Sequence, residues 1–251
     1  MYKRPGFEEL LKKWTNRDIL SGIMSDIYDG KIWQTFPSHP NTPNSPRFFD
    51  PKTADRNLGI MINLDWFQPF QSAVYSCGAI YGVICNLPRD IRFKRENMLT
   101  LALLPGPNEV KLDKINHYLA PVIDELLELW DGCNLPALNK DATGKNIRLA
   151  VICCSNDIPA GRKLCGHISA LAACHRCYKI ADGEEGQRAN FGGFEDMDEW
   201  FKMKDPVKHR QNAIIWKNKE RKKIRISMLV KIWFSGRNCS VYHILTQLDF
   251  W

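Results

Sequence analysis

Two aspartates stand where a pair of apolar segments ends, and they are the residues best placed for chemistry. Asp65 closes the segment LGIMINLD (58–65), and Asp157 follows the segment NIRLAVICCSN (146–156). If both segments are neighbouring parallel strands, their carboxyl ends meet at one edge of the sheet, where open α/β sheets place their sites. Two carboxylates held close together repel each other unless a cation lies between them, and Mg²⁺ or Mn²⁺ is the usual solution.

Divalent ions on such a carboxylate pair predict phosphoryl transfer. They can activate a water or a 3′-hydroxyl and stabilise the leaving oxygen during in-line displacement. The formal net charge of +7 favours a polyanionic partner such as a nucleic acid, because Lys and Arg neutralise phosphates. The alternative is that Asp65 and Asp157 are unrelated turn residues that bond nearby backbone amides. Their spacing in the sequence leaves both interpretations open.

A second constellation follows the second aspartate. Cys174 and Cys177 form a C-x-x-C pair within CGHISALAACHRCYK (165–179), which predicts a Zn²⁺ site. A tetrahedral site needs two more ligands, and the candidates are Cys165, His167, His175 and His209. Two alternatives stay open: a redox pair, which would open a helix directly after a strand, and two buried structural thiols.

The strands and the helix that must position the two aspartates can be predicted from the pattern of apolar residues. Apolar runs predict strands over 58–67, 73–88 (one long or two short strands), 97–107 and 146–161, and helical spacing predicts a helix over 111–132. Pro121 is expected to kink or split this helix. The order is strand, strand, strand, helix, strand, which indicates an α/β fold with a mixed sheet. Asp65 and Asp157 end the first and last of these strands.

The region before the first strand is expected to contain no strand, but a helical segment followed by a linker or loop. Residues 1–33 are predicted to be helical, with one packed face. That face is formed by Ile19, Leu20, Ile23, Met24 and Ile27. Residues 34–56 hold five prolines and are predicted to form a linker or irregular loop.

Bulk composition narrows the class of protein. With 251 residues, 44% hydrophobic and 25% charged, a wholly disordered chain is excluded. There is no apolar run of about 18 residues and the N-terminus is a charged amphipathic segment, so neither a membrane span nor a signal peptide is expected. In an intracellular protein the nine cysteines are expected to be reduced thiols or metal ligands.

Several motifs in one order resemble a known family. The stretches LGIMINLDWFQPF (58–70) and NDIPAGRKLCGHISALAACHRCY (156–178) resemble the transposases of CACTA (En/Spm-like) DNA transposons, which carry an LxxDGxxPF-like stretch and an NDxPA…G…C-x-x-C stretch. The resemblance also takes in DIYDGKIW (26–33) and the segment 102–132, and it covers roughly residues 20–216.

The resemblance implies an RNase H-like mixed sheet and a DDE/DDD-type, Mg²⁺-dependent nuclease and strand transferase that acts in the nucleus on transposon ends and target DNA. Asp65 matches the first catalytic acid and Asp157 the second, while Cys174 and Cys177 match the family's C-x-x-C. Trp66 stands where the family often has Gly. No residue matches the family's D-x-x-H element or third acid, and the acids of GGFEDMDEW (192–200) are expected to be solvated.

The expected organisation has four parts. They are an N-terminal helical segment with a Pro-rich linker (1–56), a partial RNase H-like core (57–164), a Cys/His-containing insertion (165–216) and a basic tail (217–251). The tail does not resemble the family, so the chain is expected to be incomplete at its C-terminus and impaired in cleavage. Its run KNKERKKIR (217–225) is a candidate DNA-contact or nuclear-import patch. The alternative function is a non-catalytic, zinc-stabilised domain that binds nucleic acid or another partner.

Overall fold

The computed structural model describes residues 1–19, 22–40, 42–135 and 144–164, together with residues 205, 207, 208 and 211. The chain divides into two units. The first, called the sheet unit below, takes in Met1–Val110 and His117–Ser155. The second takes in Lys111–Asn116 and resumes at Asn156.

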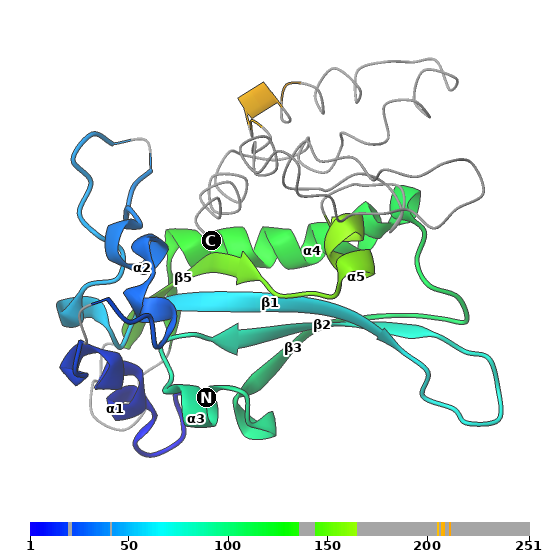
Figure 1. Cartoon of the computed structure of the whole chain (residues 1–251), viewed down its shortest axis with the longest axis horizontal. Coiled ribbons are helices and arrows are strands. Elements are labelled where there is room, and N and C mark those ends of the chain that lie inside the picture. Colours follow the sequence, from blue (N-terminus) through cyan, green and yellow to red (C-terminus); the bar gives the residue numbers. More distant parts are fainter. Residues whose placement is uncertain are drawn as a thin grey trace. The chain divides into compact units, whose positions relative to one another are not determined.

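Five strands in the order β3-β2-β1-β5-β4 form the centre of the sheet unit (Figure 1). The strands are β1 (Asn57–Phe67), β2 (Cys77–Ile84), β3 (Met98–Leu104), β4 (Cys133–Leu135) and β5 (Lys145–Cys154). β1 pairs antiparallel with β2 and parallel with β5, while β2–β3 and β4–β5 are antiparallel pairs. The fold is therefore mixed α/β. β5, the strand predicted within 146–161, lies parallel to β1, which is the arrangement assumed for the two aspartates, and the short β4 precedes it after the long helix.

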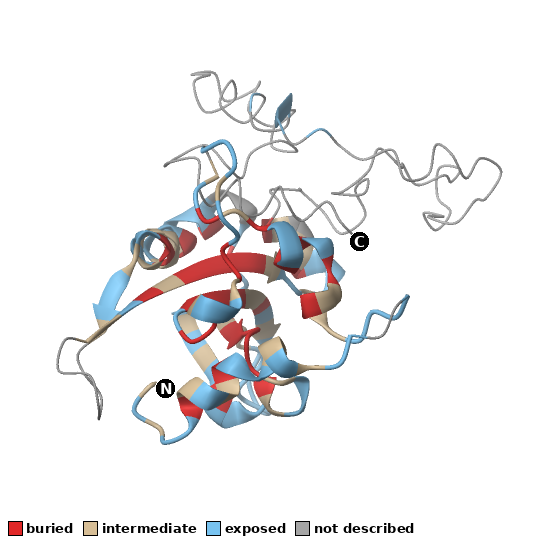
Figure 2. Cartoon of the chain, turned by 90° about the vertical axis from the view of Figure 1, so that its left-hand side faces the viewer, coloured by how far each residue is buried: buried red, intermediate tan, exposed pale blue. Residues whose placement is uncertain are grey.

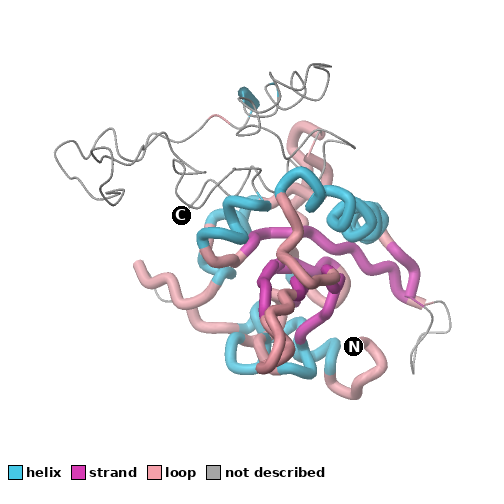
Figure 3. Tube along the Cα trace, turned by 90° about the vertical axis from the view of Figure 1, so that its right-hand side faces the viewer, coloured by secondary structure: helices cyan, strands magenta, loops and turns pink. Residues whose placement is uncertain are grey.

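Helical segments of the sheet unit lie on both sides of its strands (Figure 3). The helices of the described residues are α1 (Phe7–Lys12), α2 (Lys31–Thr35), α3 (Arg89–Arg92), α4 (Leu112–Asp131) and, in the second unit, α5 (Ile158–Leu164), with 3₁₀ turns η1 (Lys13–Asn16), η2 (Ile27–Asp29), η3 (Pro51–Thr53) and η4 (Arg95–Asn97). α4 confirms the predicted helix almost to the residue, and it continues through Pro121 rather than splitting there. The last predicted strand is shorter than expected, because α5 begins where its final residues were placed.

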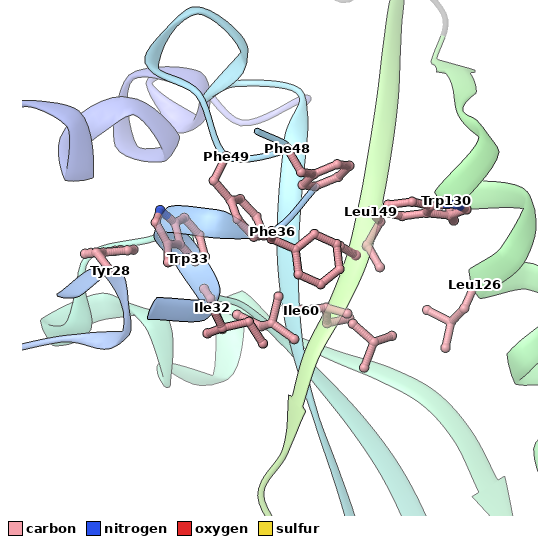
Figure 4. Packing of buried hydrophobic residues seen from close by; sticks show 14 residues of the cluster. Tyr28, Ile32, Trp33, Phe36, Phe48, Phe49, Ile60, Leu126, Trp130 and Leu149 are labelled. Carbon is pink, nitrogen blue, oxygen red and sulfur yellow. The ribbon is translucent and has the colours of Figure 1, made fainter. Parts of the chain in front are cut away.

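An aromatic cluster joins the segment before β1 to the sheet and to α4 (Figure 4). The rings of Trp33 and Phe49 stack with centroids 3.8 Å apart, and those of Phe48 and Trp130 stack at 5.2 Å. Gly59 in β1 makes room for this cluster, since a Cβ there would lie 2.8 Å from the Trp33 ring. Burial follows the central strands (Figure 2). The Pro-rich region is thus irregular, as predicted, yet its phenylalanines belong to the core.

The predicted helical face at residues 19–27 is wrong. Ile19, Ile23 and Met24 are exposed, and the described residues between η1 and η2 are not helical. Acidic side chains accept hydrogen bonds from backbone N–H groups that, in a helix, would donate to backbone carbonyl groups. Asp26 and Asp29 form a capping box around η2, and Asp29 accepts from the backbone N–H of Ser25 at 2.8 Å. Local side-chain bonding therefore outweighs the apolar spacing here.

Acid should weaken the sheet unit through Asp29. The hydrogen bond from Arg17 is the main reason that the pKa of Asp29 lies well below its usual range. As the pH falls, Asp29 of the unfolded chain binds a proton at a higher pH than Asp29 of the folded protein does. The free energy of unfolding should therefore fall as the pH drops below about 4. Asp29→Asn should lower that free energy at neutral pH and reduce its dependence on acid. Urea unfolding across this pH range, with the exposed Asp18→Asn as control, checks this; an unchanged slope in Asp29→Asn would contradict it.

Among the described residues, no helix is both long and apolar enough to cross a membrane.

Candidate active site

Asp65 lies near the carboxyl end of β1 and is exposed. Its Oδ1 accepts a hydrogen bond from the backbone N–H of Trp66 at 2.8 Å. An ionised carboxylate has acceptor positions on both oxygens, so one backbone bond leaves it able to bind a ligand. This position is compatible both with a metal ligand and with the simpler role of a residue that bonds its own backbone.

The indole of Trp66 points away from the face on which Asp65 lies. Consecutive residues of a strand face opposite sides of the sheet, and Trp66 pairs with Gly78 of β2. A Cβ on Gly78 would lie 3.0 Å from the indole nitrogen, so the ring packs over that glycine. The bulky residue beside the acid is therefore accommodated by a glycine on the next strand, on the face opposite to Asp65.

Asn63 ties the end of β5 to β1 and was missed in the sequence. Its Nδ2 donates to the backbone oxygen of Ser155, and the N–H of Ser155 donates to the oxygen of Ile62 at 2.8 Å. These two bonds hold the chain beside β1 just after β5 ends. The signal that could have revealed Asn63 is its place two residues before Asp65, which puts both side chains on one face.

Asp157 follows Ser155 by two residues and belongs to the second unit. Its Oδ1 accepts from the N–H of Ala160 at 2.8 Å, so it caps the start of α5. The last paired residues of β1 and β5 are Ile62 and Cys154, and each aspartate comes three residues after its member of that pair. A shared site for Asp65 and Asp157 stays a prediction.

Within the described part of the chain, no group of three or more His, Cys, Asp or Glu side chains could hold a metal ion. The predicted zinc ligands Cys174 and Cys177 lie outside the described residues. The same holds for the further candidates Cys165, His167, His175 and His209, for the acids of 192–200 and for the basic run 217–225. These assignments therefore stay predictions.

The cysteines that the structure describes are free thiols, as the reduced state predicts: Cys77, Cys85, Cys133, Cys153 and Cys154. Burial raises the pKa of the Cys153 thiol to about 11. Such a thiol is protonated at neutral pH and is a poor nucleophile. It does not offer an alternative centre for chemistry.

Comparison with known proteins places the chain in a family. A family model described as "Transposase family tnp2" matches residues 21–231, a range that contains β1, β5, Asp65 and Asp157. No curated protein matches the chain. Since the family match extends over most of the sequence, this chain belongs to the tnp2 family of transposases.

Proposed function

We propose that this chain is the RNase H-like core of a CACTA-like transposase, in which Asp65 and Asp157 bind Mg²⁺ or Mn²⁺ for DNA cleavage and strand transfer. The observation that carries the proposal is the parallel pairing of β1 with β5. Asp65, within β1, and Asp157, after β5, each come three residues after the last pair of the two strands, Ile62 and Cys154. Three antiparallel strands, a long helix and a strand parallel to the first are also the order predicted for the RNase H-like sheet.

The donor set suits a hard divalent cation. Both aspartates are exposed carboxylates, and oxygen is the ligand that Mg²⁺ and Mn²⁺ prefer. A bound ion would activate a water or a 3′-hydroxyl and stabilise the leaving oxygen. The backbone donors Trp66 N–H and Ala160 N–H each engage one carboxylate oxygen, which limits rotation of the side chain. Among the described residues, each carboxylate accepts a backbone hydrogen bond on its Oδ1.

The remaining parts of the proposal concern the partner and a structural metal ion. The net charge of +7 supports DNA as the partner, both the transposon ends and the target, in the nucleus. Cys174 and Cys177 are proposed to bind a structural Zn²⁺. Metal binding and DNA binding are the properties proposed for these 251 residues.

Metal titration tests the proposal without requiring turnover. The spin-resonance signal of free Mn²⁺ should fall in a saturable manner as protein is added, and DNA binding should weaken as salt rises. DNA binding without any saturable Mn²⁺ binding would reject the metal site. That result would favour the second candidate function, a non-catalytic nucleic-acid-binding domain, which the basic net charge supports by itself.

Asn63 provides a separate test of how Asp157 is positioned. Asn63→Ala removes the bond to Ser155, two residues before Asp157, and should weaken Mn²⁺ binding by roughly tenfold or more, as loss of a supporting contact typically does. Asn146→Ala is the matched control, because it removes an exposed bond to Asn134 near the start of β5. Equal Mn²⁺ affinities for the two variants would show that Asn63 has no part in the site.

A further inference from the structure

The connection between β1 and β2 carries an exposed apolar surface that the proposed metal site does not use. We call Phe67, Phe70, Val74 and Leu103 the hairpin surface; their exposed fractions are 42%, 55%, 89% and 67%. The family-like motif LDWFQPF continues through Phe67 and Phe70, beyond the aspartate. Exposed apolar side chains that lie near one another are typical of surfaces that contact a partner.

The register of the sheet places part of the hairpin surface on the Asp65 face. Asp65 pairs with Ala79 of β2, and Ala79 pairs with Leu103 of β3, so Leu103 lies two strands across on the same face. Phe67 follows Asp65 by two residues and shares that face as well. A DNA strand with a phosphate at Asp65 would therefore have Phe67 as a neighbour on the same face.

The hairpin is braced, and this holds the Phe70 ring in place. Phe70 meets Tyr75 edge to face, with ring centroids 5.6 Å apart. A Cβ on Gly106 would lie 2.5 Å from the Tyr75 ring, which shows how closely that ring packs on the turn after β3. Ser76 N–H also donates to the oxygen of Pro107 at 2.8 Å. The exposed ring thus needs little further ordering before it can bind a partner.

Charge indicates which part of a nucleic acid would contact the hairpin surface. Residues 66–88 contain no Asp, Glu, Lys, Arg or His, so this segment has no side chain to neutralise a phosphate. It offers aromatic rings together with the amides of Gln68 and Gln71. Rings stack on bases and amides hydrogen-bond base edges, whereas phosphates attract Lys and Arg.

We propose that the hairpin surface binds unpaired bases of the DNA strand whose phosphate lies at Asp65, and that Phe70 is the residue on which a base stacks. The inference rests on the proposed function, since it takes DNA as the partner and Asp65 as the neighbouring site. Strand separation next to the scissile phosphate would supply the unpaired bases. Stacking tolerates any base, so the surface would hold the strand without selecting its sequence.

Binding to an oligothymidylate single strand tests this proposal, because stacking on an aromatic ring does not require the terminal sequence. Phe70→Ala should lower the affinity roughly tenfold, and Phe70→Trp should keep it. The slope of affinity against salt should stay unchanged, since no phosphate contact is lost. Phe93→Ala is the matched control: Phe93 is 51% exposed and follows α3, at the end of the sheet away from the hairpin (Figure 1).

The outcomes separate this inference from the proposed function. Unchanged affinity in both Phe70→Ala and Phe67→Ala, with Mn²⁺ binding intact in both, would overturn the inference and leave the metal site standing. A tenfold loss in Phe70→Ala in a protein that binds no Mn²⁺ would support the inference and reject the metal site. A change of oligomeric state in Phe70→Ala by sedimentation, with unchanged DNA affinity, would assign the surface to a second copy of the chain and overturn the inference.

Discussion

Asp65→Asn is expected to weaken Mn²⁺ binding by roughly a hundredfold or more, because even supporting residues around a metal site change its affinity 10- to 100-fold. The substitution removes the negative charge, while the Asn oxygen can still accept the hydrogen bond from Trp66 N–H. The side chain is exposed, so the free energy of unfolding should change little. Spin-resonance titration of Mn²⁺ measures the affinity, and urea unfolding shows that the fold is kept.

Stoichiometry tells whether the two aspartates share one site. If Asp65 and Asp157 hold the same ion, Asp157→Asn should abolish the same binding event, and the double variant should be little weaker than either single one. Asp90→Asn is the matched control, because Asp90 is an exposed aspartate of α3 beyond the other end of β2. Single variants that each lose only part of the bound Mn²⁺ would indicate two separate sites and would contradict the proposal.

The second large effect concerns Arg92, which ties the N-terminal region to the sheet. Arg92 is only 4% exposed, and its guanidinium donates to both carboxylate oxygens of Asp26, at 2.8 and 3.0 Å. It also donates to the Leu87 oxygen and the Tyr28 hydroxyl. Burial is the largest single influence and lowers the pKa of Arg92, but the hydrogen bonds to Asp26 together with the nearby Tyr28, Cys85 and Asp26 charges raise that pKa overall. Arg92→Met should lower the free energy of unfolding by about 3 to 5 kcal/mol.

Most of that loss is expected to come from the partner left behind. Arg92→Met leaves the Asp26 carboxylate without its cation, and adding Asp26→Asn should recover part of the stability. Arg89→Met is the control, because exposed Arg89 makes a long bond of 3.3 Å to the Ser25 oxygen and should cost less than about 1 kcal/mol. Denaturant unfolding measures all four proteins. A loss in Arg92→Met no larger than in Arg89→Met would contradict the proposed role of the buried pair.

The longer strands and the long helix could be predicted from the sequence because the spacing of apolar residues differs between strands and helices. The mostly apolar segment 58–64 is short and rich in isoleucine, which favours a strand over a helix, and β1 begins one residue before its predicted start. The helical spacing of 111–132 likewise predicted α4. The place of Asp65 near the end of β1 followed from the predicted strand, whereas the parallel pairing of β1 with β5 was only an assumption until the structure provided it.

Other features depended on contacts between residues far apart in the sequence. The apolar residues 19–27 fit a helix, yet Asp26 pairs with Arg92, 66 residues away, and Asp29 pairs with Arg17. β4 spans only three residues and forms through its pairing with β5. Asn63 looks like any polar residue of a strand until Ser155 lies beside it.

The sequence by itself determined the strands, the long helix, the place of Asp65 in β1 and the family resemblance, since these depend on local spacing and motif order. Only the tertiary structure decided that the Trp66 ring packs over Gly78, on the face opposite to Asp65, and that Leu103 shares the Asp65 face across two strands. The physical reason is that side-chain direction and strand register are properties of paired strands, and one strand read alone does not contain them.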